Sequence, residues 1–261
     1  MTPIESTPVK GSTGRQYHIK VAPGEVGEVV LMPGDPFRVQ LVADRLVDAV
    51  EVAHAREYRT MVGRYKGMTV TAMSTGIGCP SAAIAVEELA RCGVHTFIRV
   101  GSTAALQEHV AVGDLVVNTG TYRNDGTSLA YAPLGYPAVP DTELTMSLLS
   151  VAREYAGPVG AEVHVGINVS DDAFYAEGPE WMSRMTSLGL LNVEMESAAI
   201  FTVARLRGLR AGMVCGVSGN LVSGDAPYGG DHNARLARGW EQSIDIALEA
   251  AHRLLVNPPA G

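Results

Sequence analysis

Residues 28–38, EVVLMPGDPFR, contain the clearest indication of the fold. The four residues from Val29 to Met32 are all apolar and lack the alternation of a half-exposed strand, which is typical of a strand buried on both faces. The Pro-Gly-Asp-Pro sequence that follows predicts a sharp turn. The stretch therefore predicts the end of a central strand in a sheet that is covered on both sides.

Outward from this stretch, short β-rich segments alternate with helical patterns. This order predicts strands that crossover helices bring parallel, and hence an α/β fold. We expect a central, mixed but mostly parallel twisted sheet flanked by helices. The predicted strands are Glu28–Met32, Thr69–Ser74, Thr96–Val100, Asp114–Asn118, Val163–Val169 and Gly212–Val217. The predicted helices are Ser81–Cys92, Met195–Arg207 and Asn233–Leu255.

The length of the chain favours a single domain. It has 261 residues, of which 46% are hydrophobic and 18% charged, so it can bury a large core. No internal repeat or linker divides it. We predict one domain over residues 15–255, with flexible tails at 1–14 and 256–261.

Charge and cysteine content exclude several functional classes. The formal net charge is -8 and no Lys/Arg stripe is present, which argues against a nucleic-acid or anionic-membrane partner. The three cysteines form no disulfide framework and have no zinc-ligand spacing, so we expect no metal site. The chain has neither an apolar signal segment nor a run of about 18 apolar residues. We expect a cytoplasmic protein that acts on small molecules.

The turn after the first strand is a candidate phosphate site. Gly34 allows backbone N–H groups to approach an anion, and Arg38, four residues later, can donate charge-assisted hydrogen bonds to phosphate oxygens. The alternative is an ordinary tight turn with a solvated arginine, because short glycine motifs are weak signals.

Arg99 lies in a predicted strand that is otherwise apolar, where an unpaired charge is too costly to keep. Its anionic partner is either a ligand or a structural Asp or Glu. Ser102 and Thr103 follow a glycine at the predicted end of the same strand, which is the place where open α/β sheets bind ligands.

A third candidate site begins the helix at Glu194-Met195-Glu196-Ser197. A carboxylate in a first helical turn is favoured by the helix dipole, which is the simpler interpretation. Alternatively, one carboxylate accepts two hydrogen bonds from a ribose diol while Met195 lies along the sugar.

Several motifs, in order along almost the whole chain, resemble the nucleoside phosphorylase family that contains uridine phosphorylase and the hexameric bacterial purine nucleoside phosphorylases. They are the Pro-Gly-Asp-Pro-Phe-Arg loop, residues 74–81 (STGIGCPS), 99–102 (RVGS), 125–126 (DG), 172–175 (DAFY) and 194–197 (EMES). The resemblance implies cleavage of a nucleoside by inorganic phosphate, giving a free base and α-ribose-1-phosphate. Phosphate is then a co-substrate, and neither a metal nor an organic cofactor is expected.

The resemblance also implies a phosphate site. Gly34, Arg38, Arg99 and Ser102 correspond to the family's phosphate-binding residues, although the family usually has threonine at the position of Ser102. Arg56 corresponds to an arginine that a neighbouring subunit contributes to this site, with Arg59 as the alternative.

For the nucleoside, the resemblance implies that Glu196 binds the ribose diol beside Met195 and that Phe174 stacks near the base. His18 corresponds to the histidine that reaches across a dimer to the ribose 5'-hydroxyl; taken alone, it has the pattern of a surface residue. The active sites would be shared across a dimer in a homo-oligomer, and the family's common assembly is a hexamer of three dimers.

The physical mechanism of such an enzyme uses phosphate twice. Breaking the glycosidic bond develops positive charge on the sugar, which a fixed phosphate dianion stabilises before it captures C1'. We expect Arg99 and Glu196 to be catalytic on this basis.

The residues that recognise the base are less clear. Purine enzymes of the family carry an aspartate after the equivalent of Ser218, where this chain has Gly219 or, with one insertion, Asn220. Asn220 can donate a hydrogen bond to a 6-oxopurine, and we include it among the catalytic candidates. The Gln-x-Arg pair by which uridine phosphorylases bind uracil is missing after Phe174-Tyr175, whereas residues 132–139 (APLGYPAV) resemble uridine phosphorylase.

We expect inosine or guanosine as substrate, with uridine as the alternative. Two other functions remain open. One is a nucleoside hydrolase, but hydrolases of this fold lack the phosphate-binding arginines, so Arg38 and Arg99 favour phosphorolysis. The other is a catalytically silent nucleoside-binding protein, which the missing aspartate after Ser218 would fit.

Overall fold

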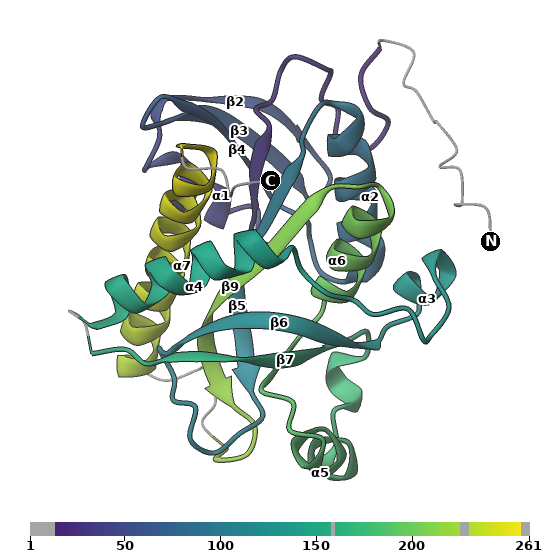
Figure 1. Ribbon diagram of the computed structural model, residues 1–261, viewed down its shortest axis with the longest axis vertical. Helices are drawn as coiled ribbons and strands as arrows, with labels where there is room; N and C mark the ends of the chain where they lie inside the picture. Colours follow the sequence, from purple (N-terminus) through teal and green to yellow (C-terminus); the bar gives the residue numbers. More distant parts are fainter. Residues whose placement is uncertain (1–13, 158–159, 225–229, 257–261) are drawn as a thin grey trace.

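The computed structural model describes residues 14–157, 160–224 and 230–256 (Figure 1). Apart from Gly14 and Val256, the tails predicted at 1–14 and 256–261 lie outside the described residues. The strands are β1 (Val29–Met32), β2 (Val47–Ala55), β3 (Tyr58–Tyr65), β4 (Met68–Met73), β5 (Thr96–Ala105), β6 (Leu115–Asn124), β7 (Val163–Asp171), β8 (Asn192–Glu194) and β9 (Arg210–Asn220). The helices are α1 (Arg38–Ala43), α2 (Cys79–Arg91), α3 (Thr127–Tyr131), α4 (Thr142–Ala156), the 3-10 turn η2 (Phe174–Ala176), α5 (Pro179–Ser187), α6 (Ser197–Leu206) and α7 (Gly230–Val256).

The described strands form one mixed sheet in the order β2-β3-β4-β1-β5-β8-β7-β6-β9. β1 is parallel to both β4 and β5, and β5 is also parallel to β9. β5 pairs with β8 as well, and β8, β7, β6 and β9 pair in turn, so these five strands close into a ring. The predicted single α/β domain with a mixed sheet is confirmed.

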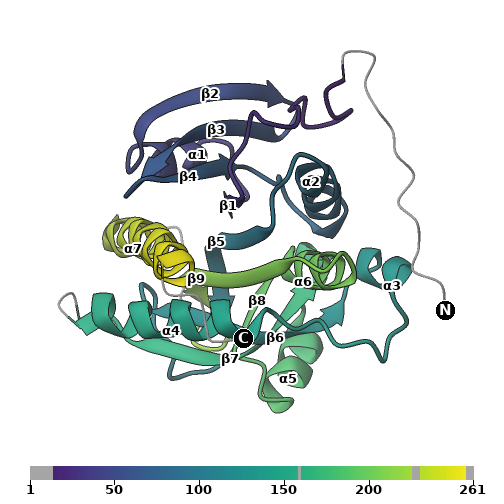
Figure 2. The ribbon, with the colours of Figure 1, turned by 45° about the horizontal axis from the view of Figure 1, so that its top comes forward.

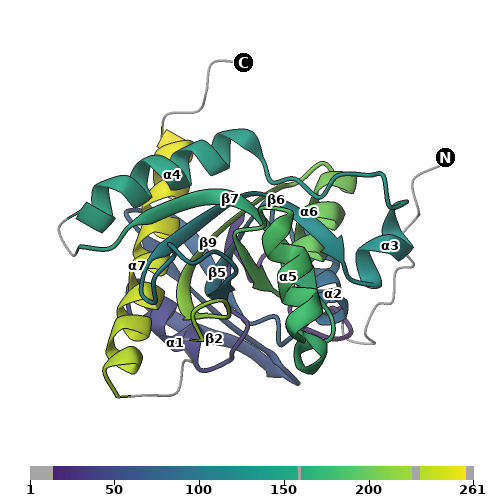
Figure 3. The ribbon, with the colours of Figure 1, turned by 90° about the horizontal axis from the view of Figure 1, so that it is seen from below.

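Both faces of β1 are buried, as its continuous apolar sequence predicts. Val29 and Leu31 belong to a core cluster with residues of α1, α4 and α7, whereas Val30 and Met32 belong to a second cluster with α2 and α6. Figure 2 shows α7 and α6 on opposite sides of β5 and β9, and Figure 3 shows α1, α4 and α7 on one side of the sheet with α2, α3 and α6 on the other. The sheet is therefore a covered central layer.

The last helix approaches the sheet closely at a pair of glycines. A Cβ atom added to Gly216 of β9 would lie 2.8 Å from the carbonyl carbon of Gly239 in α7, which no real side chain tolerates. Gly216 is paired in register with Ser102 of β5. The two glycines thus allow the backbones of α7 and β9 to meet beside Ser102.

All six predicted strands and all three predicted helices are present, with shifted ends. β6 differs most, since it runs six residues beyond its predicted end at Asn118, as far as Asn124. β5 runs five residues beyond its predicted end at Val100, as far as Ala105. Its small residues suggest a loop, but pairing with β9 keeps them in the sheet. Among the residues that the structure describes, no helix combines the length and apolarity needed to span a membrane.

Candidate active site

Two glycine turns meet at the carboxyl ends of the parallel strands β1 and β4. The backbone N–H of Thr75 donates to the oxygen of Pro33 at 2.9 Å, and that of Gly76 donates to the oxygen of Gly34 at 2.9 Å. Gly76 has φ +71°, and a Cβ there would approach Glu57 to 2.6 Å, so glycine is required. The predicted phosphate turn is therefore joined to the turn that begins α2.

Arg38 and Ser102, predicted as phosphate ligands, lie in contact. β1 ends at Met32 opposite Arg99, and β5 continues beyond it, so that Ser102 contacts Arg38 at the start of α1. The Nη1 of Arg38 donates to Ser102 Oγ at 3.3 Å. The guanidinium lies 3.6 Å from the centre of the Trp240 ring, a cation–π contact. Burial lowers the pKa of Arg38, and its Nε is buried without a hydrogen-bond partner.

Arg99 is 4% exposed and has two anionic protein partners. Its Nε donates to Glu194 at 2.6 Å, and its Nη2 forms an ion pair with Glu196. Burial alone lowers the pKa of Arg99, but the two carboxylates, Glu196 first, outweigh burial and raise it. The sequence left open whether the anionic partner of Arg99 is a ligand or a protein carboxylate, and the structure shows protein carboxylates. The Nη1 atom of Arg99 is also buried but has no hydrogen-bond partner.

The two carboxylates differ in how many bonds they already make. Glu194 also accepts hydrogen bonds from the backbone N–H of Glu196 and Ser197 and from the side chains of Asn168 and Ser170. Glu196 accepts, besides Arg99, the backbone N–H of Gly78 at 2.8 Å. Burial raises the pKa of Glu196, with Arg99 opposing. The carboxylate of Glu194 is thus fully hydrogen-bonded within the protein, whereas that of Glu196 can accept a hydrogen bond from a further partner.

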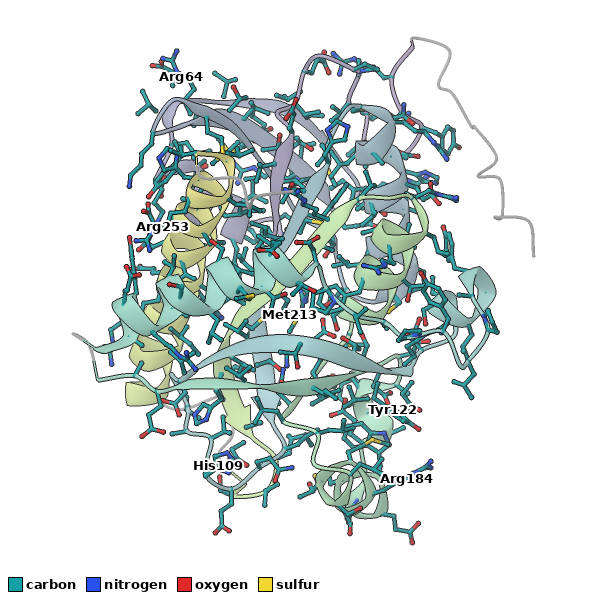
Figure 4. The ribbon with its side chains drawn as sticks, viewed as in Figure 1. Arg64, His109, Tyr122, Arg184, Met213 and Arg253 are labelled. Atoms are coloured by element: carbon teal, nitrogen blue, oxygen red, sulfur yellow. The ribbon has the colours of Figure 1, made fainter. Side chains whose placement is uncertain are left out.

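Sequence reasoning missed the role of Glu194. The signal was available in part, because Arg99 in an apolar strand requires an anion, but the sequence did not show which one. Met213 of β9, which Figure 4 labels, is paired in register with Arg99 of β5. Met195, which stands between Glu194 and Glu196 in the sequence, is half-buried.

The candidate base-binding residues belong to two segments. Phe174, in η2, is 54% exposed and packs edge-on against Tyr175, with ring centres 5.2 Å apart. Ser218 Oγ donates to the oxygen of Thr103 at 3.0 Å, and Gly219 is buried in β9.

Asn220 has no donor left for a base. Its Nδ2 donates to the oxygens of Gln107 and Val110 at 2.9 and 2.8 Å, and its Oδ1 accepts the backbone N–H of Val222 and Ser223. The side chain is 2% exposed. This amide joins the loop after β5 to the end of β9, and these bonds argue against the catalytic and base-binding roles predicted for it.

His18 and Arg56 are not among the residues that meet at Arg99. His18 Nδ1 lies 2.6 Å from Glu88 of α2. Arg56 is exposed in the β2–β3 turn with φ +58° and has no hydrogen bond or ion pair to another described residue. Arg59, by contrast, is held within its own chain by Glu51 at 2.8 Å and Gln40 at 3.0 Å.

One group of possible metal ligands lies elsewhere in the described part of the chain. Asp114, Glu162 and His164 have ligand atoms within 4.8 Å of one another. His164 Nε2 lies 2.9 Å from Asp114, whose carboxylate also accepts the backbone N–H of Ala111 and Glu162. These hydrogen bonds indicate that the cluster stabilises the start of β6.

The glycine turns, the two arginines Arg38 and Arg99, and the carboxylates of Glu194 and Glu196 are the features that identify the class of protein. The family model described as "Phosphorylase superfamily" matches residues 28–257, and the chain belongs to this family. Over 234 residues it is 45% identical to the guanosine phosphorylase of Halorubrum lacusprofundi, covering 90% of this chain and 95% of that protein. It is 42% identical over 249 residues to the uridine phosphorylase of Thermococcus kodakarensis, covering 90% and 88%.

The fold agrees with these similarities. The crystal structure of uridine phosphorylase from Vibrio fischeri matches with a TM-score of 0.85 and 34% identity, covering 93% of this chain and 99% of that one. The predicted class of enzyme, a nucleoside phosphorylase and hence a pentosyltransferase, is confirmed.

Proposed function

We propose that the chain cleaves a ribonucleoside with inorganic phosphate at the site around Arg38, Arg99 and Ser102. One observation carries this proposal: the two arginines each have a buried N–H group, Nε of Arg38 and Nη1 of Arg99, without a hydrogen-bond partner. Buried donors of a cation require an acceptor, and phosphate supplies several charged oxygens. Phosphate is the co-substrate, and we propose no other cofactor.

Glu196 exchanges partners during binding. When phosphate binds Nη1 and Nη2 of Arg99, it displaces Glu196 from Nη2 and repels the Glu196 carboxylate. Glu196 then accepts hydrogen bonds from the ribose diol, with Met195 against the sugar. The exchange makes phosphate and nucleoside each favour binding of the other.

The chemical step follows from these positions. The C1'–N bond breaks, its electron pair leaves with the base, and positive charge develops on the sugar beside the phosphate dianion. A phosphate oxygen then forms the bond to C1', giving α-ribose-1-phosphate. Arg38, Arg99 and Ser102 fix the dianion in advance, so its reorganisation does not add to the barrier.

The complete site requires a second copy of the chain. The side chain of Arg56 has no hydrogen bond or ion pair to another residue that the structure describes, whereas Arg59 is occupied by Glu51 and Gln40. We therefore favour Arg56 as the arginine that enters a neighbour's phosphate site. We propose a homo-oligomer of shared-site dimers, assembled as a hexamer. A cytoplasmic location accords with three buried free cysteines, Cys79, Cys92 and Cys215.

For the base we propose a 6-oxopurine, as in inosine or guanosine, bound by Phe174, Ser218 and Gly219. The guanosine phosphorylase at 45% identity supports this choice, as does the short segment between Tyr175 and Glu194, which has no Gln-x-Arg pair. Uridine is the second candidate, because several uridine phosphorylases are 34–42% identical to the chain.

The test is release of base from inosine, guanosine, adenosine, uridine and thymidine, each with and without phosphate, with ribose-1-phosphate detected directly. We expect phosphate-dependent cleavage, fastest with inosine or guanosine. Cleavage without phosphate would indicate a hydrolase. Binding without turnover at saturating phosphate would indicate a silent binding protein, and fastest cleavage of uridine would overturn the choice of base.

A further inference from the structure

A buried carboxylate on α2 is devoted to one short segment of the chain. The side chain of Glu88 is 3% exposed, and its oxygens accept the backbone N–H of His18 at 3.0 and 3.2 Å and that of Ile19 at 2.9 Å. The same carboxylate lies 2.6 Å from Nδ1 of His18. Burying a carboxylate is costly unless it is fully hydrogen-bonded, so this arrangement requires all of these donors.

The contact fixes the state of the imidazole. A carboxylate can only accept, so Nδ1 of His18 carries the hydrogen, and in the neutral ring Nε2 is then a hydrogen-bond acceptor. Tyr17 packs edge-on against the ring, with centres 4.8 Å apart at 87°. The His18 side chain is 28% exposed, and its Nε2 has no hydrogen bond to a described residue. Glu88 and Tyr17 thus fix the orientation of the ring, and its Nε2 is left without a partner among the described residues.

We propose that Glu88 is a positioning residue: it holds His18 as the Nδ1–H tautomer, so that Nε2 accepts the 5'-hydroxyl proton of a nucleoside bound to the neighbouring subunit. This inference rests on the proposed function with its shared-site dimers, and on the role at the neighbour's ribose that the family resemblance implies for His18. Carboxylates set the tautomer of metal-bound histidines in the same way. A merely structural Glu88 would anchor the backbone of the segment and leave recognition of the 5'-hydroxyl unchanged.

Glu88→Gln separates the two roles. The amide oxygen can still accept the backbone N–H groups, but its NH2 then faces Nδ1 and donates to it, which moves the ring hydrogen to Nε2. The matched control is Glu87→Gln on the same helix, because Glu87 is bonded to Arg207 at 2.6 Å instead of His18.

The assay measures kcat/KM of the full-length oligomer for inosine and 5'-deoxyinosine, or for uridine and 5'-deoxyuridine if uridine is cleaved faster. For Glu88→Gln we expect about a tenfold loss with the 5'-hydroxyl substrate and less than about twofold with its 5'-deoxy analogue. His18→Gln should remove the same preference, and adding Glu88→Gln to it should have no further effect. Glu87→Gln should keep the preference of the unmodified protein.

Equal losses on both substrates, or an unchanged preference, would overturn the proposal. So would the absence of any 5'-hydroxyl preference in the unmodified protein, even though phosphate-dependent cleavage, and with it the proposed function, would still stand. The unmodified protein also gives a test that requires no variant to fold. A 5'-deoxy-5'-fluoro substrate has no proton to donate, so it should react as slowly as the 5'-deoxy analogue; rates near those of the hydroxyl substrate would contradict an accepting Nε2.

Discussion

Replacing Arg99 by methionine should destabilise the folded protein strongly. The side chains of Glu194 and Glu196 are 1% and 5% exposed, and Arg99 is the cation that forms ion pairs with both. Methionine fills similar space but leaves two buried carboxylates facing each other. Removing one partner of a buried ion pair costs about 3–5 kcal/mol, a large part of the roughly 5–15 kcal/mol that stabilises a typical domain.

The loss should depend on pH with a definite sign. Burial raises the pKa of Glu196 and Arg99 opposes this, so without Arg99 the pKa of Glu196 rises further above its value in the unfolded chain, and the folded variant binds more protons than the unfolded one. Its stability must then fall as pH rises, and the deficit should be largest at pH 8 and smaller at pH 5. Urea unfolding at both pH values and a fixed protomer concentration measures it.

The control is the double variant Arg99→Met with Glu196→Gln, which removes one of the two charges and should recover about half of the loss. An Arg99→Met protein as stable as the unmodified one at pH 8, or a deficit that is the same at both pH values, would refute the account of these ion pairs.

Burial raises the pKa of Glu177 to about 7, above its value in the unfolded chain, so the charged carboxylate opposes folding at high pH. Glu177→Gln should therefore raise the free energy of unfolding by up to about 3 kcal/mol at pH 8 and have almost no effect at pH 4. Gly27→Ala should lower the melting temperature markedly, because the new Cβ would lie 2.3 Å from a backbone oxygen of β4 that cannot move aside. Arg56→Ala should raise the KM for phosphate at least about tenfold, and Arg59→Ala by much less; the opposite order in steady-state kinetics would assign the neighbour's site to Arg59.

The central strands could be predicted because burial on both faces leaves a plain sequence signature. β1 is apolar at every position, and its alternate residues enter two different core clusters. The β2–β3 hairpin gives no such signal, since Val47 and Val50 of β2 are 60% and 59% exposed at the edge of the sheet. The sequence did contain a signal for α4, because Asp141 caps it by accepting the N–H of Leu144 at 2.9 Å.

The site was predictable wherever a residue type conflicts with its surroundings. Arg99 in an apolar strand requires an anion, which the structure supplies, but no sequence pattern connects it to Glu194, 95 residues away. Asn220 shows the opposite limit. Its position after Ser218 suggested base recognition, whereas its hydrogen bonds depend on a loop near residues 107–110 that the sequence does not place beside it.

The stacking of Trp240 on Arg38 has a consequence for the order in which the protein is made. Arg38, Arg99 and Ser102 are synthesised in the first half of the chain, but Trp240 belongs to the last helix, which approaches β9 closely where Gly239 meets Gly216. During synthesis from the N-terminus, the arginines are therefore present long before the ring that covers one of them. An incomplete chain on the ribosome therefore lacks the Trp240 ring that packs on Arg38, and this contact forms only after α7 has docked.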